Sequence, residues 1–200
     1  MRTALVVLAV VVGILVVGGL FVGMIVKNFY NGTIELNEQV SEQWSNVENA
    51  YQLRADKTQN LVQIVKGAAE FERGTLTDVV EARAKATSIN VDPTNLTPEQ
   101  VQRFEQAQQQ FGGALSRLIA TIERYPDLKA VQAYQDFQVQ YEAMENRIGV
   151  ERRKFNEVAR KYNTRIKRFP GNVMAGYFDF EEKGYFEAAE GTEQAPNISL

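Results

Sequence analysis

The chain begins with an apolar run that is long enough to cross a membrane. The run ALVVLAVVVGILVVGGLFVGMIV covers residues 4–26 and holds no charged side chain. As a helix that rises about 1.5 Å per residue, it spans roughly 34 Å, more than a hydrocarbon core of about 30 Å. Lys27, Phe29 and Tyr30 follow it and suit headgroup depth. Residues 1–29 are therefore predicted to be a transmembrane anchor.

A cleaved signal peptide is the alternative interpretation of this run. Signal peptides have apolar regions of about 7–15 residues that end at a cleavage site of small residues. The run here is longer, and no clear A-x-A site follows it. Its length favours an anchor that is retained in the mature protein.

Two further features of the anchor concern its partners and its orientation. Gly19 and Gly23 form a GxxxG pair, which lets two membrane helices approach closely, although glycine is common in membrane helices generally. Arg2 on one side and Lys27 on the other leave the flanking charge nearly balanced. The amino-terminal charge favours an N-terminus inside the cytoplasm and a body outside it.

Residues 30–170 are predicted to form an antiparallel bundle of three long helices. Residues at seven-residue spacing, including Trp44, Tyr51 and Val65, mark the first, which we expect to be unbroken over residues 31–87. Residues 88–96 form the only clear loop, after which Thr97 is expected to cap the second helix. A turn at residues 125–127 leads to the third, which ends near Arg168. A short helix and an acidic, aromatic tail complete an all-α fold over residues 171–200.

The third helix has a seam of large apolar residues, and two charged residues share it. The seam residues fall seven apart at Tyr134, Tyr141, Ile148, Phe155 and Tyr162. Glu151 and Arg165 occupy seam positions, so each is expected to face another helix and to meet an opposite charge. Arg54 is the expected partner of Glu151. The asparagines of this helix lie beside the seam or opposite it, and no role is predicted for them.

The third helix is also rich in cations, which we expect to form a basic stripe on one side. These residues are Arg147, Arg153, Lys154, Arg160, Lys161, Lys167 and Arg168. Such a stripe is either a solvated face paired with neighbouring acids or a contact for anionic lipid or an acidic partner. Nucleic acid is not an expected partner, because the net charge is −3 and no aromatic stacking platform interleaves with the cations.

The last segment combines acidic and aromatic residues. Residues 179–200 carry six acids against one lysine. Phe180, Tyr185 and Phe186 are candidate interface anchors, because aromatic residues often dominate contacts. We expect the tail to fold back on a helix of its own chain or of a neighbour. A disordered acidic tail is the alternative.

Composition argues against an enzyme. The chain has no Cys and no His, which removes the thiol nucleophile, the usual general base and the usual metal ligands. The carboxylate pairs Glu70 with Glu72 and Glu181 with Glu182 are spaced i,i+2 and i,i+1, so their members would not face each other on a helix. No catalytic residue, metal ligand or cofactor-binding residue is predicted.

Short motifs along nearly the whole chain resemble the LemA family of bacterial membrane-anchored proteins. The motifs are Tyr30-Asn31, Trp44-Ser45-Asn46-Val47, Arg54-Ala55-Asp56, Asn60-Leu61-Val62, Val65-Lys66-Gly67, Glu81-Ala82-Arg83, Tyr125-Pro126-Asp127-Leu128-Lys129-Ala130, Glu145-Asn146-Arg147-Ile148, Tyr162-Asn163, Phe169-Pro170, Gly184-Tyr185-Phe186-Glu187 and Ala195-Pro196. The chain departs from the family at residues 56–62, where the family usually has a proline, and the run 176–180 matches only loosely.

The resemblance implies a helical bundle on one membrane helix in the bacterial inner membrane, with links to membrane remodelling or to membrane-protease and stress-response systems. Two functions are weighed on this basis. The predicted helix lengths favour a self-assembling scaffold. A first helix of roughly 85 Å would exceed a second of about 40 Å, and part of its apolar seam would be left for neighbouring copies to cover. A monomeric adaptor for a membrane protease or stress-response partner is the alternative.

Overall fold

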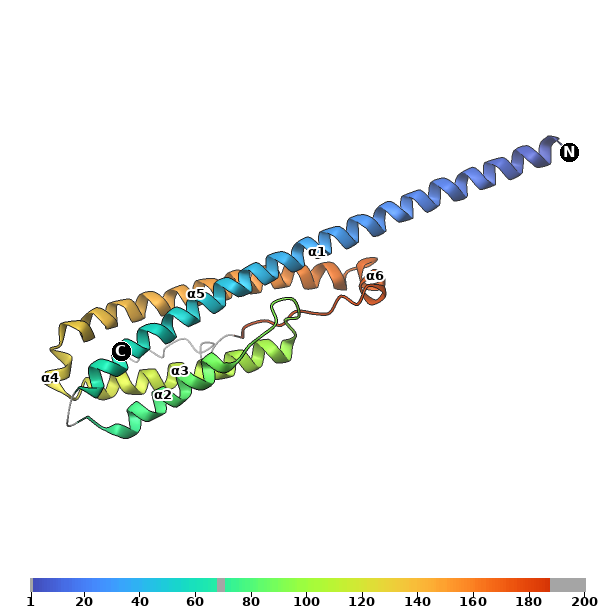
Figure 1. Cartoon of the computed structure of the whole chain (residues 1–200). Helices are drawn as coiled ribbons and strands as arrows, with labels where there is room; N and C mark the ends of the chain where they lie inside the picture. Colours follow the sequence, from blue (N-terminus) through green and yellow to red (C-terminus); the bar gives the residue numbers. More distant parts are fainter. Residues whose placement is uncertain (1, 68–70, 188–200) are drawn as a thin grey trace, which may run out of the picture.

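The computed structural model describes residues 2–67 and 71–187, which are helical over most of their length (Figure 1). No strand occurs in these two ranges, and the predicted all-α class is confirmed. The helices are α1 (Arg2–Lys66), α2 (Arg73–Ser88), α3 (Pro98–Ile122), α4 (Pro126–Lys129), α5 (Gln132–Lys167) and α6 (Gly171–Tyr177).

Helix α1 joins the apolar N-terminal run to the bundle without a break. It is 65 residues long, and all of residues 7–25 are exposed. Figure 1 shows this part of α1 extending beyond the other helices. By length and composition it is the one helix of the described chain that is able to cross a membrane. An exposed apolar surface of this size is typical of a segment that contacts lipid or a protein partner.

The prediction that the first bundle helix runs from residue 31 to residue 87 is wrong. Helix α1 ends at Lys66, and α2 returns antiparallel to it. Gly67 follows the last helical residue, a position where glycine commonly ends helices. On the far side of this reversal Phe71 packs against Tyr125 with ring centroids 5.1 Å apart. The apolar residues of α1 and of α2 both face the core. The seven-residue spacing therefore did not reveal the reversal between the two helices.

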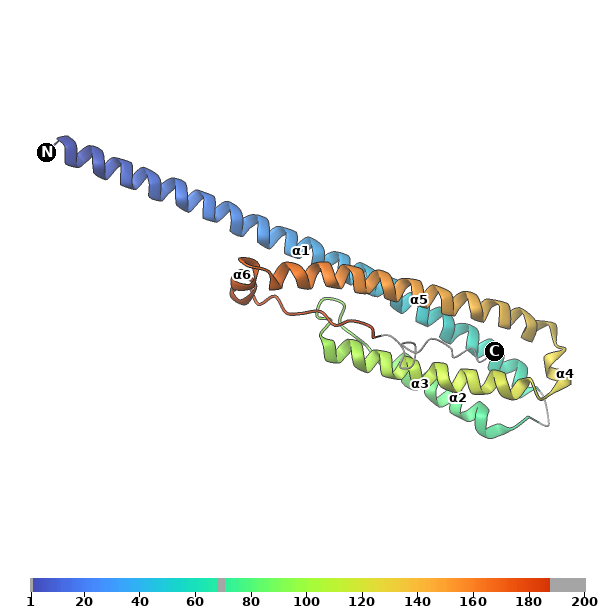
Figure 2. The same cartoon turned by 180° about the vertical axis from the view of Figure 1, so that it is seen from behind.

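Two helix pairs form the layers of the bundle. Helix α1 packs along α5, and α2 packs along α3, as Figures 1 and 2 show from opposite sides. The 36 residues of α5 match the 36 residues of α1 from Asn31 to Lys66. The part of α1 in the bundle is about 54 Å long rather than roughly 85 Å, so it exceeds the 25 residues of α3, about 38 Å, by much less than predicted. This weakens the length argument for exchange of seams between copies.

The core near the anchor is aromatic and includes a residue from the C-terminal segment. Trp44 lies against Phe104 and Phe155, with centroids 5.0 and 5.4 Å away. Phe186 stacks on Trp44 at 5.8 Å and is 4% exposed. A second cluster, which includes Leu61 and Phe111, fills the far half of the bundle. The C-terminal segment is thus part of the fold.

The start of α3 agrees with its predicted cap. The Thr97 hydroxyl accepts a hydrogen bond from the backbone N–H of Gln100 at 3.4 Å, and Pro98 is the first helical residue. The Gln100 side-chain oxygen is buried without a hydrogen-bond partner among the described residues. The reciprocal contact of a capping box is therefore not formed.

Candidate functional site

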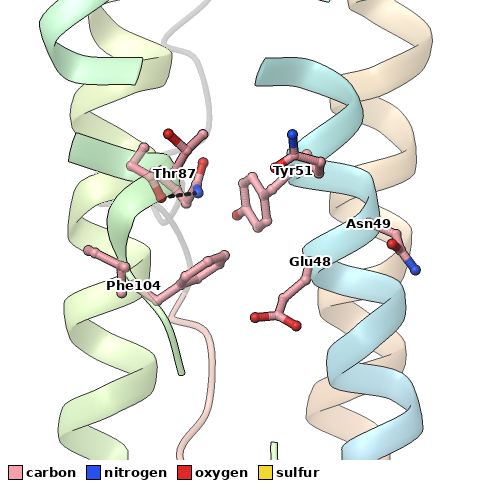
Figure 3. Close-up of a pocket in the computed structure, with 9 residues that line it drawn as sticks. Glu48, Asn49, Tyr51, Thr87 and Phe104 are labelled. Atoms are coloured by element: carbon pink, nitrogen blue, oxygen red, sulfur yellow. Dashed lines mark hydrogen bonds between the residues drawn. The ribbon is translucent and has the colours of Figure 1, made fainter. Parts of the chain in front are cut away.

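The described part of the chain contains no group of three or more potential metal ligands. One groove lies between α1 and the α2–α3 region and has a volume of about 290 Å³. Figure 3 shows Glu48 and Tyr51 reaching from α1 toward Thr87 and Phe104, while Asn49 points away. Glu48 is the only carboxylic acid that lines this groove. One acid without a second acid or a base does not form an acid–base pair.

Burial explains the altered ionisation of Glu48. It raises the pKa of the carboxyl above its ordinary value, and the indole N–H of Trp44 offsets part of that rise. This N–H is buried and forms no hydrogen bond with any acceptor in the described ranges. We therefore assign the raised pKa of Glu48 to burial. The carboxyl therefore takes up a proton more readily than an exposed glutamate does.

Asparagines of α5 hold the C-terminal segment, a role that the sequence did not suggest. The Asn163 amide donates to the Lys183 carbonyl at 2.8 Å and accepts from the Lys183 N–H at 2.9 Å. Asn156 binds both backbone groups of Phe186 in the same way, at 2.7 and 2.9 Å. The prediction that these asparagines have no role is wrong. Their spacing of seven residues was the available signal.

Charged side chains add to this attachment. Arg152 forms an ion pair with the buried Glu105 and also donates to the Glu187 carbonyl. Lys183 is buried, which lowers its pKa, and its ammonium donates to the Thr94 carbonyl at 2.9 Å. These contacts close the C-terminal segment over the α3 and α5 surfaces of its own chain.

The predicted partner of Glu151 is wrong. Glu151 accepts a hydrogen bond from Gln43 at 2.7 Å and pairs with Lys154 of its own helix at 3.1 Å. Arg54 is 4% exposed and pairs with Glu145 at 3.0 Å. It also donates to the backbone and side-chain oxygens of Gln108 at 3.0 and 2.9 Å. Arg54 therefore joins α1, α3 and α5 at one buried point.

Arg165 does face another helix, but it does not meet an opposite charge there. Its guanidinium donates to the carbonyls of Asn28 and Phe29 at 2.7 and 3.1 Å and to the Thr33 hydroxyl at 3.0 Å. No carboxylate lies within 4.0 Å of it in residues 2–67 and 71–187. It links the end of α5 to α1 just past the apolar run, because backbone carbonyls supply the acceptors.

The seven cations of the basic stripe are all exposed, and they lie in two rows along α5. Lys154 and Lys161 belong to a row beside α1, since Lys154 pairs with Glu151 next to Gln43. Lys167 belongs to a row beside the C-terminal segment, where it pairs with Glu182. Lys161 pairs with Glu157 at 2.9 Å. The remaining four, Arg147, Arg153, Arg160 and Arg168, have no carboxylate within 4.0 Å in the part of the chain described.

The other predicted contact residues lie in two different environments. A Cβ atom placed on Gly19 or Gly23 would meet nothing within 4 Å. Phe180 packs at 6.1 Å from Phe29, and Phe186 is buried in the core, whereas Tyr185 is 39% exposed. The fold thus uses Phe180 and Phe186 within one chain and leaves the two glycines uncovered. Of the four acids weighed for catalysis, Glu70 lies outside the described residues, and Glu72, Glu181 and Glu182 are exposed.

Comparison with known proteins gives matches over most of the chain. "Magnetosome protein MamQ 1" and "Magnetosome protein MamQ 2" of Paramagnetospirillum magneticum are each 26% identical over 175 residues, covering 79% of this chain. The chain spans 64% of the length of these two relatives. "Protein LemA" of Metamycoplasma hominis is 26% identical over 178 residues, covering 86% of this chain and 78% of that protein.

None of these names denotes an enzyme. The apolar N-terminal part of α1 gives the described chain one helix that is able, by length and composition, to span a membrane. The sequence pattern of the LemA family matches residues 43–200, which include most of the bundle and the C-terminal segment. The chain therefore belongs to the LemA family.

Proposed function

We propose that the protein is a non-enzymatic scaffold of the bacterial inner membrane that self-assembles and takes part in membrane remodelling or envelope organisation. The observation that carries this proposal is the continuity of α1 from the apolar run into the bundle core. A helix without a linker transmits the orientation of the anchor to the bundle. Copies whose anchors associate would therefore hold their bundles in a common orientation. Similarity to two magnetosome proteins supports a role at a specialised membrane.

The closed bundle limits how copies would contact one another. Trp44, Phe155 and Phe186 are buried within one chain, so the aromatic core offers no open seam to a neighbour. The anchor is different, because all of residues 7–25 are exposed. Gly19 and Gly23 lie one turn apart and carry no side chain, which allows close packing of two anchors. Assembly through the anchor is thus compatible with a bundle that is complete in each copy.

Light scattering of the full-length protein in detergent tests the scaffold directly. We expect the wild type to have the protein mass of several chains, and Gly19→Ile with Gly23→Ile to reduce it. Gly13→Ile is the matched control, since Gly13 is equally open but points to another side of α1. A wild type with the mass of one chain would exclude the scaffold. Particle images of the same sample would show whether the assembly has a defined shape.

A monomeric adaptor for a membrane protease or a stress-response partner is the second candidate. The specific observation in its favour is the same closed core, because a bundle that includes its own C-terminal segment needs no second copy to fold. A one-chain mass in detergent and in lipid nanodiscs would support this candidate.

We also propose that the bundle lies outside the cytoplasm. The chain has no native cysteine, so Val139→Cys would give one reactive thiol at a side chain that is 72% exposed. Labelling of intact spheroplasts with a membrane-impermeant maleimide is expected. Labelling only after lysis would place the bundle in the cytoplasm.

A further inference from the structure

The end of the bundle nearest the anchor carries apolar side chains that the core does not use. Phe169 is 83% exposed, Val173 is 66% exposed and Tyr177 is 82% exposed. Val173 and Tyr177 lie four residues apart on α6 and so share a face of that helix, while Gly171 and Ala175 are buried. Isolated exposed apolar residues are ordinary, but three of them within nine residues of chain form a patch. We call Phe169, Val173 and Tyr177 the α6 edge.

The α6 edge lies beside the point where α1 leaves the apolar run. A Cβ atom on Gly171 would come within 2.8 Å of the Phe29 ring. Tyr30 and Phe178, the residue after α6, pack with ring centroids 5.0 Å apart. Phe29 is three residues beyond Val26, an axial distance of about 4.5 Å. When residues 4–26 span a bilayer, α6 therefore lies at the depth of the lipid headgroups.

A groove of about 470 Å³ connects the α6 edge to the apolar run. Ile25, Phe29 and Met174 are among its apolar lining residues, and Ile25 is itself part of the run. Lys161, Arg165 and Arg168 also line it. The two arginines have no carboxylate within 4.0 Å among the residues that the structure describes, whereas Lys161 pairs with Glu157. The groove thus has an apolar wall that continues from the anchor and cations beside it.

We propose that the α6 edge and this groove form a second membrane contact, in which the α6 edge enters the bilayer interface and Arg165 and Arg168 bind an anionic phospholipid headgroup. Aromatic side chains prefer the interface, and guanidinium groups match phosphate oxygens in geometry and charge. The lipid's acyl chain would follow the apolar wall toward Ile25. Continuity of this wall with the anchor is what identifies lipid as the occupant. The bundle would then be held at two points, which fixes its tilt.

This inference rests on a membrane-spanning α1 and is independent of self-assembly. It is tested with full-length protein in phosphatidylcholine vesicles, with and without phosphatidylglycerol. Tyr177→Trp supplies a fluorophore on the α6 edge. The native Trp44 is 0% exposed, so its emission can be measured in the wild type and subtracted. Lipids brominated near the headgroup end of the acyl chain should quench the tryptophan introduced at position 177.

Val139→Trp is the matched control, because Val139 is 72% exposed and lies near the start of α5, which begins at Gln132. That end of α5 is far from the anchor (Figure 1). The tryptophan at position 139 should lose no emission to brominated lipid and should be quenched by aqueous acrylamide. Equal quenching by acrylamide at both positions would overturn the lipid contact. Shielding of position 177 from both quenchers would assign the α6 edge to another protein chain, and would overturn it too. Phe169→Trp repeats the measurement if Tyr177→Trp fails to fold.

The headgroup part has its own test. Native mass spectrometry of full-length protein released from detergent should show retained phosphatidylglycerol in the wild type. Arg168→Gln should reduce that retention, and Arg153→Gln should not, because Arg153 is an exposed cation of α5 that lies outside the groove. Equal retention by both variants, or equal retention of phosphatidylcholine and phosphatidylglycerol by the wild type, would overturn the assignment of Arg168 to an anionic headgroup.

Discussion

Asn163 on α5 binds both backbone groups of Lys183, with donor–acceptor distances of 2.8 and 2.9 Å. Seven residues earlier, Asn156 does the same for Phe186. Residues 181–187 are in neither a helix nor a strand, so their backbone groups need partners from elsewhere. The two amides supply those partners at Lys183 and Phe186. In this way α5 places the Phe186 ring against Trp44.

Asn163→Ala is expected to destabilise the full-length protein in detergent by about 1–3 kcal/mol, because it leaves two buried backbone groups of Lys183 without partners. Chemical unfolding followed by circular dichroism measures the change. Asn146→Ala is the control, since Asn146 is exposed on the same helix and should change stability by less than about 0.5 kcal/mol. Equal losses for the two variants would show that the amide contacts with Lys183 do not stabilise the fold.

Seven-residue spacing revealed which faces of α5 are apolar but not what the asparagines contact. Such spacing reports a helix packed on helices, whereas the partner of Asn156 and Asn163 is an extended segment at least 20 residues further along the chain. An extended segment without strand alternation has no periodic signal. The aromatic residues of that segment did predict that it folds back, and Phe186 does so within its own chain.

The pairing of Arg54 shows a second limit of the sequence. Arg54 was expected to meet Glu151, and the structure pairs it with Glu145. These two glutamates are six residues apart, or about 9 Å along α5. Seam positions define the face of each helix, but the axial register between α1 and α5 depends on the reversal at Gly67, on α4 and on the loops. The sequence showed neither the reversal nor this register.

The Arg54–Glu145 pair should be energetically coupled, because Arg54 is 4% exposed while the Glu145 side chain is 38% exposed. A double-mutant cycle of Arg54→Met and Glu145→Gln, measured by chemical unfolding, is expected to give a coupling of about 0.5–3 kcal/mol. Lys161 and Glu157 form the control pair, since both are more than half exposed and should couple by about 0.3–0.5 kcal/mol. A smaller coupling for the buried pair would contradict this expectation.

The anchor should make the protein integral to the membrane. Residues 4–26 are expected to remain attached, because an apolar helix of this length spans the hydrocarbon core and no clear cleavage site follows. Carbonate extraction should leave the protein in the membrane pellet, and its N-terminal sequence should begin before Ala4. A soluble mature protein, or one that begins after Lys27, would contradict the prediction.

Glu48 should make the stability of the bundle depend on pH. Burial raises its pKa in the folded state above the ordinary value of 4.5, so the folded protein binds a proton more tightly than the unfolded chain. The resulting cost is absent below pH 4.5, grows as pH rises through the folded pKa and is complete above it. Glu48→Gln should therefore gain stability over the wild type as pH rises from 4 to 7. Glu42→Gln, at an exposed position on the same helix, is the control. A constant difference between Glu48→Gln and the wild type over this range would exclude the effect.

Gly184 should tolerate no side chain, because it lies where the C-terminal segment crosses the start of α3. A Cβ atom there would come within 2.9 Å of both the Pro98 Cα and the Val101 Cβ. The Gly184 N–H also donates to the Leu96 carbonyl at 2.9 Å, so the segment has little room to move away. Gly184→Ala is expected to lower stability by about 1–3 kcal/mol, the usual cost of overpacking.

Gly176→Ala is the matched control: Gly176 is exposed, a Cβ there meets nothing within 4 Å, and alanine favours the helical conformation of α6. Thermal unfolding in detergent should show a loss only for Gly184→Ala. If both variants have the melting temperature of the wild type, the C-terminal segment does not pack against α3 at this point.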